Sequence, residues 1–90
     1  MLVISYDISD SKLRTRFSKM LTKNGAIRLQ FSVYEVNNTQ RQIDNLIVKI
    51  ETKFTPQFTG ADSIMIFEAS SNNIRKYGNA IHRDKDLLFI

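Results

Sequence analysis

The apolar positions at the start of the chain change from an extended to a helical pattern. Residues 2–4 are apolar without a break, which is typical of a short buried strand. Asp7 falls where that strand should end. Apolar residues then recur three and four positions apart, at Leu13, Phe17, Met20 and Leu21. This spacing predicts an amphipathic helix that packs on a sheet.

The residues around this helix supply signals for its two ends. Either Ser9 or Asp10 can accept hydrogen bonds from the free amides of the first turn, so the helix should begin there. Gly25 can adopt the left-handed conformation with which many helices end. On a helical wheel, Arg14 and Arg16 lie on opposite sides of the apolar stripe. Both can therefore reach solvent or a ligand from the flanks of the helix.

Apolar and polar residues alternate from Ala26 to Val36. The alternation runs through Ile27–Phe31 and begins again after Ser32, in Val33–Val36. This pattern favours two short strands with a kink or bulge near Ser32. One long bent strand is the alternative interpretation.

A turn that contains two asparagines leads into a second helical pattern. Thr39 and Gln42 fit a capping box, in which a hydroxyl and an amide each satisfy a backbone donor of the first turn. The apolar stripe of this helix consists of Ile43, Leu46, Ile47, Ile50 and Phe54. Pro56 cannot continue a helix, so we expect the helix to end near Lys53 and residues 55–60 to form a loop.

The last third of the chain holds one clear strand pattern and a less regular tail. The apolar run within Ser63–Glu68 predicts a buried strand. Residues 70–73 should form a turn, and residues 74–77 are short enough for an edge strand. The chain ends in four apolar residues, 87–90, which favour aggregation unless they add to a sheet. They can join their own sheet or a partner's, and we expect the partner's because the domain is small.

Together these elements give the order β-α-β-β-α-β. An α+β domain of this order is ferredoxin-like, with an antiparallel sheet, both helices on one face and the other face left to be covered. We therefore expect a single ferredoxin-like domain over residues 1–90, with a C-terminal edge strand exchanged in a homodimer. A chain this short buries only about 60–65% of its extended surface, which also favours an oligomer.

The amino-acid composition limits the cellular compartment of the protein and the kinds of catalytic or metal site that it can hold. The chain has no cysteine, which excludes disulfides and thiolate zinc sites and is compatible with a reducing cytosol. Its first residues include neither the basic segment nor the long apolar run of a signal peptide. No later apolar stretch is long enough to span a membrane. We therefore expect a cytoplasmic protein with no membrane partner. A single histidine, His82, excludes a Ser/His/Asp or Cys/His catalytic constellation.

The net charge of +4 is moderate, and its placement is more informative than its size. Six basic side chains fall in or just after the first predicted helix: Lys12, Arg14, Arg16, Lys19, Lys23 and Arg28. A solvated helix face and a phosphate-binding surface are both compatible with this pattern. We expect a phosphate near the end of the first strand, where a carboxylate lies in front of this basic helix.

Asp7 is the candidate for phosphodiester chemistry. An aspartate at a strand end commonly caps or forms a salt bridge, and one carboxylate is a poor site for a divalent cation. The neighbouring Asp10 is expected to cap the helix. A two-fold dimer would remove this difficulty, because Asp7 and its symmetry mate would form a carboxylate pair. A metal between the two would activate water and neutralise a phosphodiester.

Tyr6 and Tyr34 are the aromatic candidates for contact with nucleobases. Both lie in predicted strands, where packing in the core is the commoner role for an aromatic ring. The sequence leaves both roles open.

Three stretches carry a family-specific spacing: Val3–Asp10, the helical Arg14-x-Arg16-x-x-Lys19-x-Leu21, and Gly25-x-x-Arg28-x-Gln30-x-Ser32-Val33-Tyr34-Glu35. Together they closely resemble the second CRISPR-associated protein, a family of small metal-dependent nucleases that act in spacer acquisition. The motifs cover the first third of the chain, and the order of elements is similar as far as the strand that ends at Glu68. Residues 72–90 follow no pattern that can be carried over.

This resemblance implies a ferredoxin-like homodimer that exchanges terminal strands. It implies that Asp7 binds a catalytic Mg²⁺ for phosphodiester hydrolysis, on RNA in some members and on double-stranded DNA in others. The residues that would assist binding or activity are Tyr6, Arg14, Arg16, Arg28 and Tyr34. The family also bridges two dimers of the CRISPR integrase, the first Cas protein, and holds prespacer DNA. Nuclease activity can be dispensable in that role.

Three functions are compatible with the sequence. The first is a magnesium-dependent endonuclease with a pair of Asp7 side chains at the dimer axis. The second is a non-catalytic DNA-binding adaptor of spacer acquisition that uses the same arginines. The third is a small ferredoxin-like regulatory or toxin-type module with no connection to CRISPR.

Overall fold

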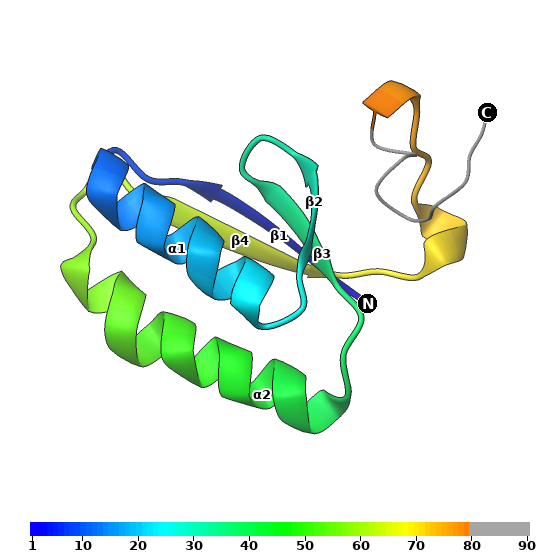
Figure 1. Cartoon of the computed structure of the whole chain (residues 1–90), viewed down its shortest axis with the longest axis horizontal. Helices are drawn as coiled ribbons and strands as arrows, with labels where there is room; N and C mark the ends of the chain where they lie inside the picture. The colour runs from blue at the N-terminus through cyan, green and yellow to red at the C-terminus, as the bar shows by residue number, and fades with distance from the viewer. Residues whose placement is uncertain (80–90) are drawn as a thin grey trace.

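The computed structural model of the chain describes residues 1–79, so the predicted C-terminal strand at 87–90 and His82 lie outside the described residues. Two helices and four strands follow one another in the predicted order β-α-β-β-α-β (Figure 1). They are β1 (Leu2–Asp7), α1 (Ser11–Lys23), β2 (Ile27–Gln30), β3 (Val33–Val36), α2 (Gln40–Lys49) and β4 (Ser63–Glu68).

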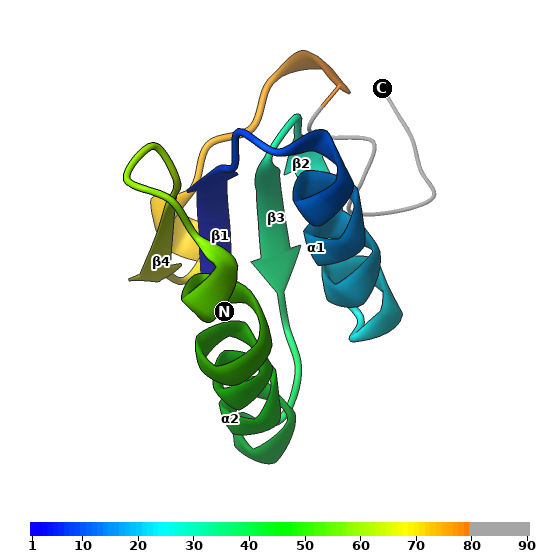
Figure 2. The same cartoon turned by 90° about the vertical axis from the view of Figure 1, so that its left-hand side faces the viewer.

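The four strands form one antiparallel sheet in the spatial order β2-β3-β1-β4. Both helices cover the same face of this sheet, as Figure 2 shows. Neither α1 nor α2 covers the opposite face, and we call it the helix-free face. The predicted ferredoxin-like α+β architecture is confirmed. Among residues 1–79, no helix combines the length and the apolar character needed to cross a lipid bilayer.

Alternation along β1 decides which side chains enter the core. Leu2, Ile4 and Tyr6 are buried and belong to the cluster that both helices cover. Successive side chains of a strand point to opposite faces. The odd-numbered residues of β1, which end with Asp7, therefore face the helix-free side. Among the core residues, Ile4, Phe17, Leu21 and Val36 have no exposed surface.

Local side-chain chemistry sets both ends of α1 and the start of α2 as predicted. The Asp10 carboxylate accepts a hydrogen bond from the Leu13 amide at 2.8 Å and caps α1. Gly25 has φ +88° just past the other end, where a Cβ would also lie 3.1 Å from the Asn38 amide nitrogen. The predicted capping box at the start of α2, between Thr39 and Gln42, is present.

The region from Ile27 to Val36 is a hairpin of two strands, which confirms the first of the two interpretations. Gln30 pairs with Val33, so Phe31 and Ser32 form a two-residue turn. Ser32 has φ +67°, a conformation that residues other than Gly, Asn and Asp seldom adopt. A register shift between Arg28 and Gln30 marks a bulge in β2 at Leu29, before the expected position near Ser32.

The second helix ends less abruptly than its proline predicts. After α2, the chain continues as a π-helical turn at Ile50–Phe54 and a 3₁₀ turn at Thr55–Gln57. The expected loop from residue 55 is therefore wrong for its first three residues. Pro56 lies in the first turn of the 3₁₀ segment, where the missing N–H is not needed by any helical hydrogen bond.

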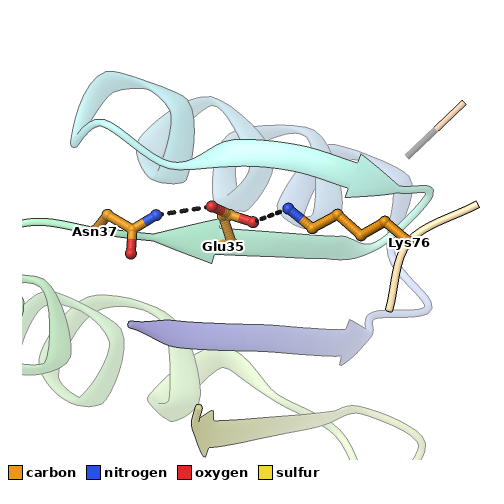
Figure 3. Close-up of polar contacts among 3 residues, drawn as sticks. All are labelled: Glu35, Asn37 and Lys76. Carbon is orange, nitrogen blue, oxygen red and sulfur yellow. Dashed lines mark hydrogen bonds and ion pairs between the residues drawn. The ribbon is translucent and has the colours of Figure 1, made fainter. Parts of the chain in front are cut away.

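The segment after β4 forms the predicted turn, as a 3₁₀ turn at Ser71–Asn73, but the edge strand considered for residues 74–77 is wrong. A side chain holds this segment instead: the Lys76 ammonium lies 2.7 Å from the Glu35 carboxylate (Figure 3). Asn37 donates to the other Glu35 oxygen at 2.7 Å. Because Glu35 lies on the helix-free face of β3, the segment is anchored onto the face of the sheet and does not extend its edge.

Candidate nucleic-acid interface

A small pocket lies where the end of β1 meets the first half of α1 and the β2–β3 turn. Four of the six residues predicted to act in the site line it together. The lining residues are Tyr6, Arg14, Thr15, Ser18, Arg28, Phe31, Ser32 and Tyr34. None of these is acidic. The pocket therefore presents two guanidinium groups and several hydroxyls without a carboxylate that would repel a phosphate.

The two predicted tyrosines contribute their hydroxyls to this pocket, because their rings are buried. Tyr6 is 7% exposed and Tyr34 is 4% exposed. The Tyr6 ring lies edge-on to Phe17 at 4.8 Å and is stacked near Tyr34 at 6.1 Å. Their faces are therefore not available to nucleobases. The Tyr34 hydroxyl donates to the Ser18 hydroxyl at 3.2 Å.

The Tyr6 hydroxyl is a neutral hydrogen-bonding group over the whole physiological pH range. Burial away from water, with Tyr34 alongside, raises the pKa of Tyr6 to about 12. A phenolate at this place would repel a phosphate, whereas the protonated hydroxyl can donate to one. The predicted role of Tyr6 and Tyr34 in nucleic-acid binding stays a prediction, limited to these hydroxyls.

Arg14 and Arg28 reach the pocket from different elements. Arg14 is half-buried on α1, and its guanidinium donates to the Ile8 carbonyl at 2.9 Å, just beyond the end of β1. Arg28 is exposed on β2. A guanidinium has five N–H donors in a planar fork, so Arg14 keeps most of its donors after this one bond. This bond to the backbone fixes the position of the guanidinium at the pocket.

Arg16 does not join this pocket. It is exposed on the other flank of α1 and donates to the Gln57 side chain at 3.3 Å. This confirms that Arg14 and Arg16 emerge on opposite sides of the helix. Any role of Arg16 is therefore at a separate position, about one helix diameter away, on the order of 10 Å.

Asp7 lies beside the pocket in sequence but on the other face of the sheet. It is the last residue of β1, it is exposed, and it is opposite Ser63 of β4 in the register. Its side chain makes no hydrogen bond or ion pair with any of residues 1–79. The carboxylate is thus free to bind a ligand on the helix-free side of the strand end.

Comparison with known proteins agrees with this arrangement of fold and residues. The family model described as CRISPR associated protein Cas2 matches residues 1–77. The chain belongs to the Cas2 family. This confirms the resemblance based on the three motifs and excludes a small module with no connection to CRISPR.

Two individual relatives of this Cas2-family chain add detail. It is 32% identical over 54 residues to a protein of Methanospirillum hungatei JF-1 named CRISPR-associated endoribonuclease Cas2 1. The match covers 60% of this chain and 57% of that relative, so it spans little more than half of either. The crystal structure of hypothetical protein TT1823 from Thermus thermophilus has a TM-score of 0.69, at 23% identity, over 86% of this chain and 88% of the other. That similarity supports the fold.

Asp62 of this Cas2-family chain has a positioning role that the sequence reasoning missed. One of its oxygens accepts from the Ser9 amide and hydroxyl, both at 2.8 Å, and the other from the Thr59 amide and hydroxyl. These bonds lower the pKa of Asp62 to about 2. Asp62 thereby ties the start of β4 to the loop directly after Asp7. An aspartate in a Thr-Gly-Ala-Asp turn before a strand was the available signal.

The carboxylates of one subunit supply a minimal donor set for a metal. Among residues 1–79, no three His, Asp or Glu side chains come close enough to share a cation. Asp10 caps α1 and Asp62 is occupied by four donors, which leaves Asp7 as the free carboxylate at this end of the sheet. Mg²⁺ is often held by one or two carboxylates with waters and phosphate oxygens, so Asp7 fits such a site but does not complete it.

Proposed function

We propose that this Cas2-family protein is a cytoplasmic, magnesium-dependent endonuclease that hydrolyses phosphodiesters of RNA or DNA as a homodimer. The free Asp7 carboxylate at the end of β1, which directly follows Tyr6 of the pocket but faces the other side of the sheet, is the observation that carries this proposal. The name of the Methanospirillum relative, an endoribonuclease, supports it. Family membership supports a place in spacer acquisition beside the CRISPR integrase.

Substrate binding in this proposal begins with the phosphates. Arg14 and Arg28 bind backbone oxygens in the pocket, and the hydroxyls of Tyr6 and Tyr34 add neutral donors. Arg16 extends the basic surface on the other flank of α1. These contacts are independent of base sequence, as expected for a protein that must handle many different sequences.

The second copy of the chain covers the helix-free face. Alternation along the strands places Asp7 on the same face as Met65 and Phe67 of β4, which are 57% and 48% exposed. Ile66, on the same strand, is 39% exposed. An apolar strand at the edge of the described sheet is a favourable surface for self-association. A dimer formed there brings two Asp7 carboxylates toward a common axis.

Asp7 of each subunit would hold the Mg²⁺. When bound, the cation supplies a more acidic water and neutralises charge that develops on the phosphodiester. The residues of the chain itself orient the substrate: Arg14, fixed on the Ile8 carbonyl, holds a phosphate at the strand end. Asp62 keeps the loop after Asp7 in place.

An isosteric substitution tests the catalytic role. Asp7→Asn removes the charge but keeps the shape, and Asp44→Asn is the matched control, because Asp44 is an exposed aspartate on α2. Both proteins, purified in parallel, are incubated with single-stranded RNA and with double-stranded DNA, in Mg²⁺ and in EDTA. We expect cleavage by wild type and Asp44→Asn in Mg²⁺, and a loss of at least about 100-fold for Asp7→Asn. Cleavage that survives Asp7→Asn rules out the proposed chemistry.

One observation favours a second function, the non-catalytic DNA-binding adaptor between integrase dimers. Each subunit offers a single free carboxylate at the strand end, and no group of three potential metal ligands exists within residues 1–79. The adaptor requires the basic pocket but not Asp7. Spacer acquisition in cells that carry Asp7→Asn separates the two functions: acquisition at the wild-type rate supports the adaptor, and its loss supports a requirement for the carboxylate.

A further inference from the structure

Phe31 is the one aromatic ring of the pocket with free faces. It is 75% exposed at the tip of the β2–β3 turn, whereas the rings of Tyr6 and Tyr34 are buried. A phenyl ring in water gains nothing from that position, because an apolar side chain contributes to stability only when it is buried. Its neighbours in the pocket, Arg14 and Arg28, are cations.

The backbone fixes Phe31 in this exposed position. Ser32, the next residue, is held in the left-handed region at φ +67°, which is unfavourable for a residue with a Cβ. The Ser32 carbonyl accepts a hydrogen bond from the Tyr6 amide at 3.1 Å, which ties the turn to the central strand. The strained turn is therefore held against the sheet by this hydrogen bond. It presents the ring of Phe31 beside the guanidiniums of Arg14 and Arg28.

We propose that Phe31 stacks on an unpaired nucleobase whose phosphate is bound by Arg14 and Arg28. The inference deepens the proposed function, since it rests on nucleic-acid binding by this pocket. An exposed aromatic ring beside cations is the combination that binds single strands, because every base has a π-face and every nucleotide has a phosphate. In a duplex, the base faces are hidden by stacking. Phe31 therefore selects single-stranded segments, such as loops or frayed ends, over a continuous duplex.

An apolar protein surface is the less favourable occupant of this pocket. Such a partner would have to desolvate Arg14 and Arg28, and no acidic residue of the pocket pairs with them. A nucleotide supplies both the flat ring for Phe31 and the anion for the arginines. The two occupants are distinguished by the experiment below.

The first measurement compares Phe31→Ala with Tyr77→Ala. Tyr77 is the matched control, because it is also 75% exposed but does not line the pocket. The probes are a fluorescent single-stranded oligonucleotide, its RNA equivalent and the blunt duplex. We expect Phe31→Ala to weaken single-strand binding about 5-fold or more. Duplex binding should change less than about two-fold and keep the same dependence on salt, because the phosphate contacts remain. Tyr77→Ala should bind like wild type.

The second measurement uses Phe31→Trp, which keeps an aromatic ring in a chain that has no other tryptophan. Stacking on a base should quench its fluorescence when the single strand is added. An oligonucleotide with abasic sugars at every position should bind without quenching.

Three results overturn the inference. They are single-strand binding by Phe31→Ala that equals wild type, no quenching of Phe31→Trp by bound single strand, and a loss of self-association in Phe31→Ala, which would mean that the ring packs on a protein. If wild type binds nucleic acid and only these tests fail, the proposed function stands. If wild type binds no nucleic acid, or binding is unchanged in Arg14→Ala with Arg28→Ala, both fail.

Discussion

The two faces of the sheet differ in how completely one copy of the chain covers them. On the face under the helices, Ile4, Phe17 and Val36 have no exposed surface. On the helix-free face, Met65 and Phe67 are about half exposed, although they lie on a strand directly beside β1. The same sheet thus forms a fully buried core on one side and leaves apolar side chains exposed to solvent on the other. The first face accounts for folding, and the second is available for association.

The polar groups follow the same division. On the covered side, the hydroxyls of Tyr6, Tyr34 and Ser18 gather at the rim of the core and open into the basic pocket. On the helix-free side, the buried Glu35 carboxylate is paired with Lys76 from a segment that follows β4. Four substitutions test this division, in order of the change in stability that we expect.

Phe17→Ala should have the largest effect. The ring of Phe17 has no exposed surface and makes edge-on contacts with Tyr6 at 4.8 Å and with Phe54 at 5.1 Å. Its removal leaves a cavity between α1 and the sheet, so the free energy of unfolding should fall by about 3–5 kcal/mol. Urea unfolding followed by circular dichroism measures this loss. A loss below about 1 kcal/mol would show that the covered face is not the core of the fold.

Lys76→Met tests the ion pair on the helix-free face. The Glu35 side chain is 6% exposed and that of Lys76 is 14% exposed, so the substitution leaves a buried carboxylate to which, among residues 1–79, only Asn37 donates. The free energy of unfolding should fall by about 1–3 kcal/mol. The double variant Lys76→Met with Glu35→Gln, which removes the buried charge, should recover part of the loss. Equal stability of the single variant and wild type would contradict the anchoring role.

Tyr6→Phe tests the hydroxyl cluster through pH. The pKa of Tyr6 in the folded chain is about 12, above the unfolded value near 10, so the fold favours the protonated form. The stability that comes from this preference is fully present below about pH 10 and is lost as the pH rises toward 12. Between these two pH values, the free energy of unfolding should decline less for Tyr6→Phe than for wild type. Identical pH profiles would mean that Tyr6 titrates normally.

Phe67→Ala should have the smallest effect on the unfolding of a single subunit, below about 1 kcal/mol, because the side chain is already half exposed. The loss of stability caused by Phe67→Ala should grow with protein concentration if a second copy covers this face. Sedimentation equilibrium of wild type and Phe67→Ala gives the dissociation constant directly. A wild-type chain that stays monomeric at high concentration would exclude the proposed homodimer.

The parts of the fold that could be predicted are those with a local signal. The caps at Asp10 and Thr39 and the left-handed Gly25 each depend on residues within a few positions of one another. The contacts that were missed join distant parts of the chain. Lys76 meets Glu35 across 41 positions, and Asp62 meets Ser9 across 53. No pattern of neighbouring residues carries such information, so residues 74–77 were interpreted only by the length of the segment.

For the candidate site, helical periodicity predicted where two of the arginines lie, whereas the exposure of Phe31 was missed. A helix turns about 100° per residue, so two positions place Arg14 and Arg16 on opposite flanks, as the helical wheel indicated. Phe31 was assigned to a strand, where an aromatic ring is usually packed. Its exposure follows from the turn that Ser32 makes with φ +67°, and this conformation is unusual for serine.

The alternation of Tyr6 and Asp7 has a consequence for how this protein can change over time. Neighbouring residues of one strand serve opposite sides of the sheet, so a replacement at either position leaves the surroundings of the other nearly intact. Under the proposed function, one substitution at Asp7 would abolish hydrolysis and leave the phosphate contacts of the pocket in place. Insertion or deletion of one residue in the strand would instead move Tyr6 and Asp7 each to the opposite face of the sheet. Both the pocket and the free carboxylate would then be lost.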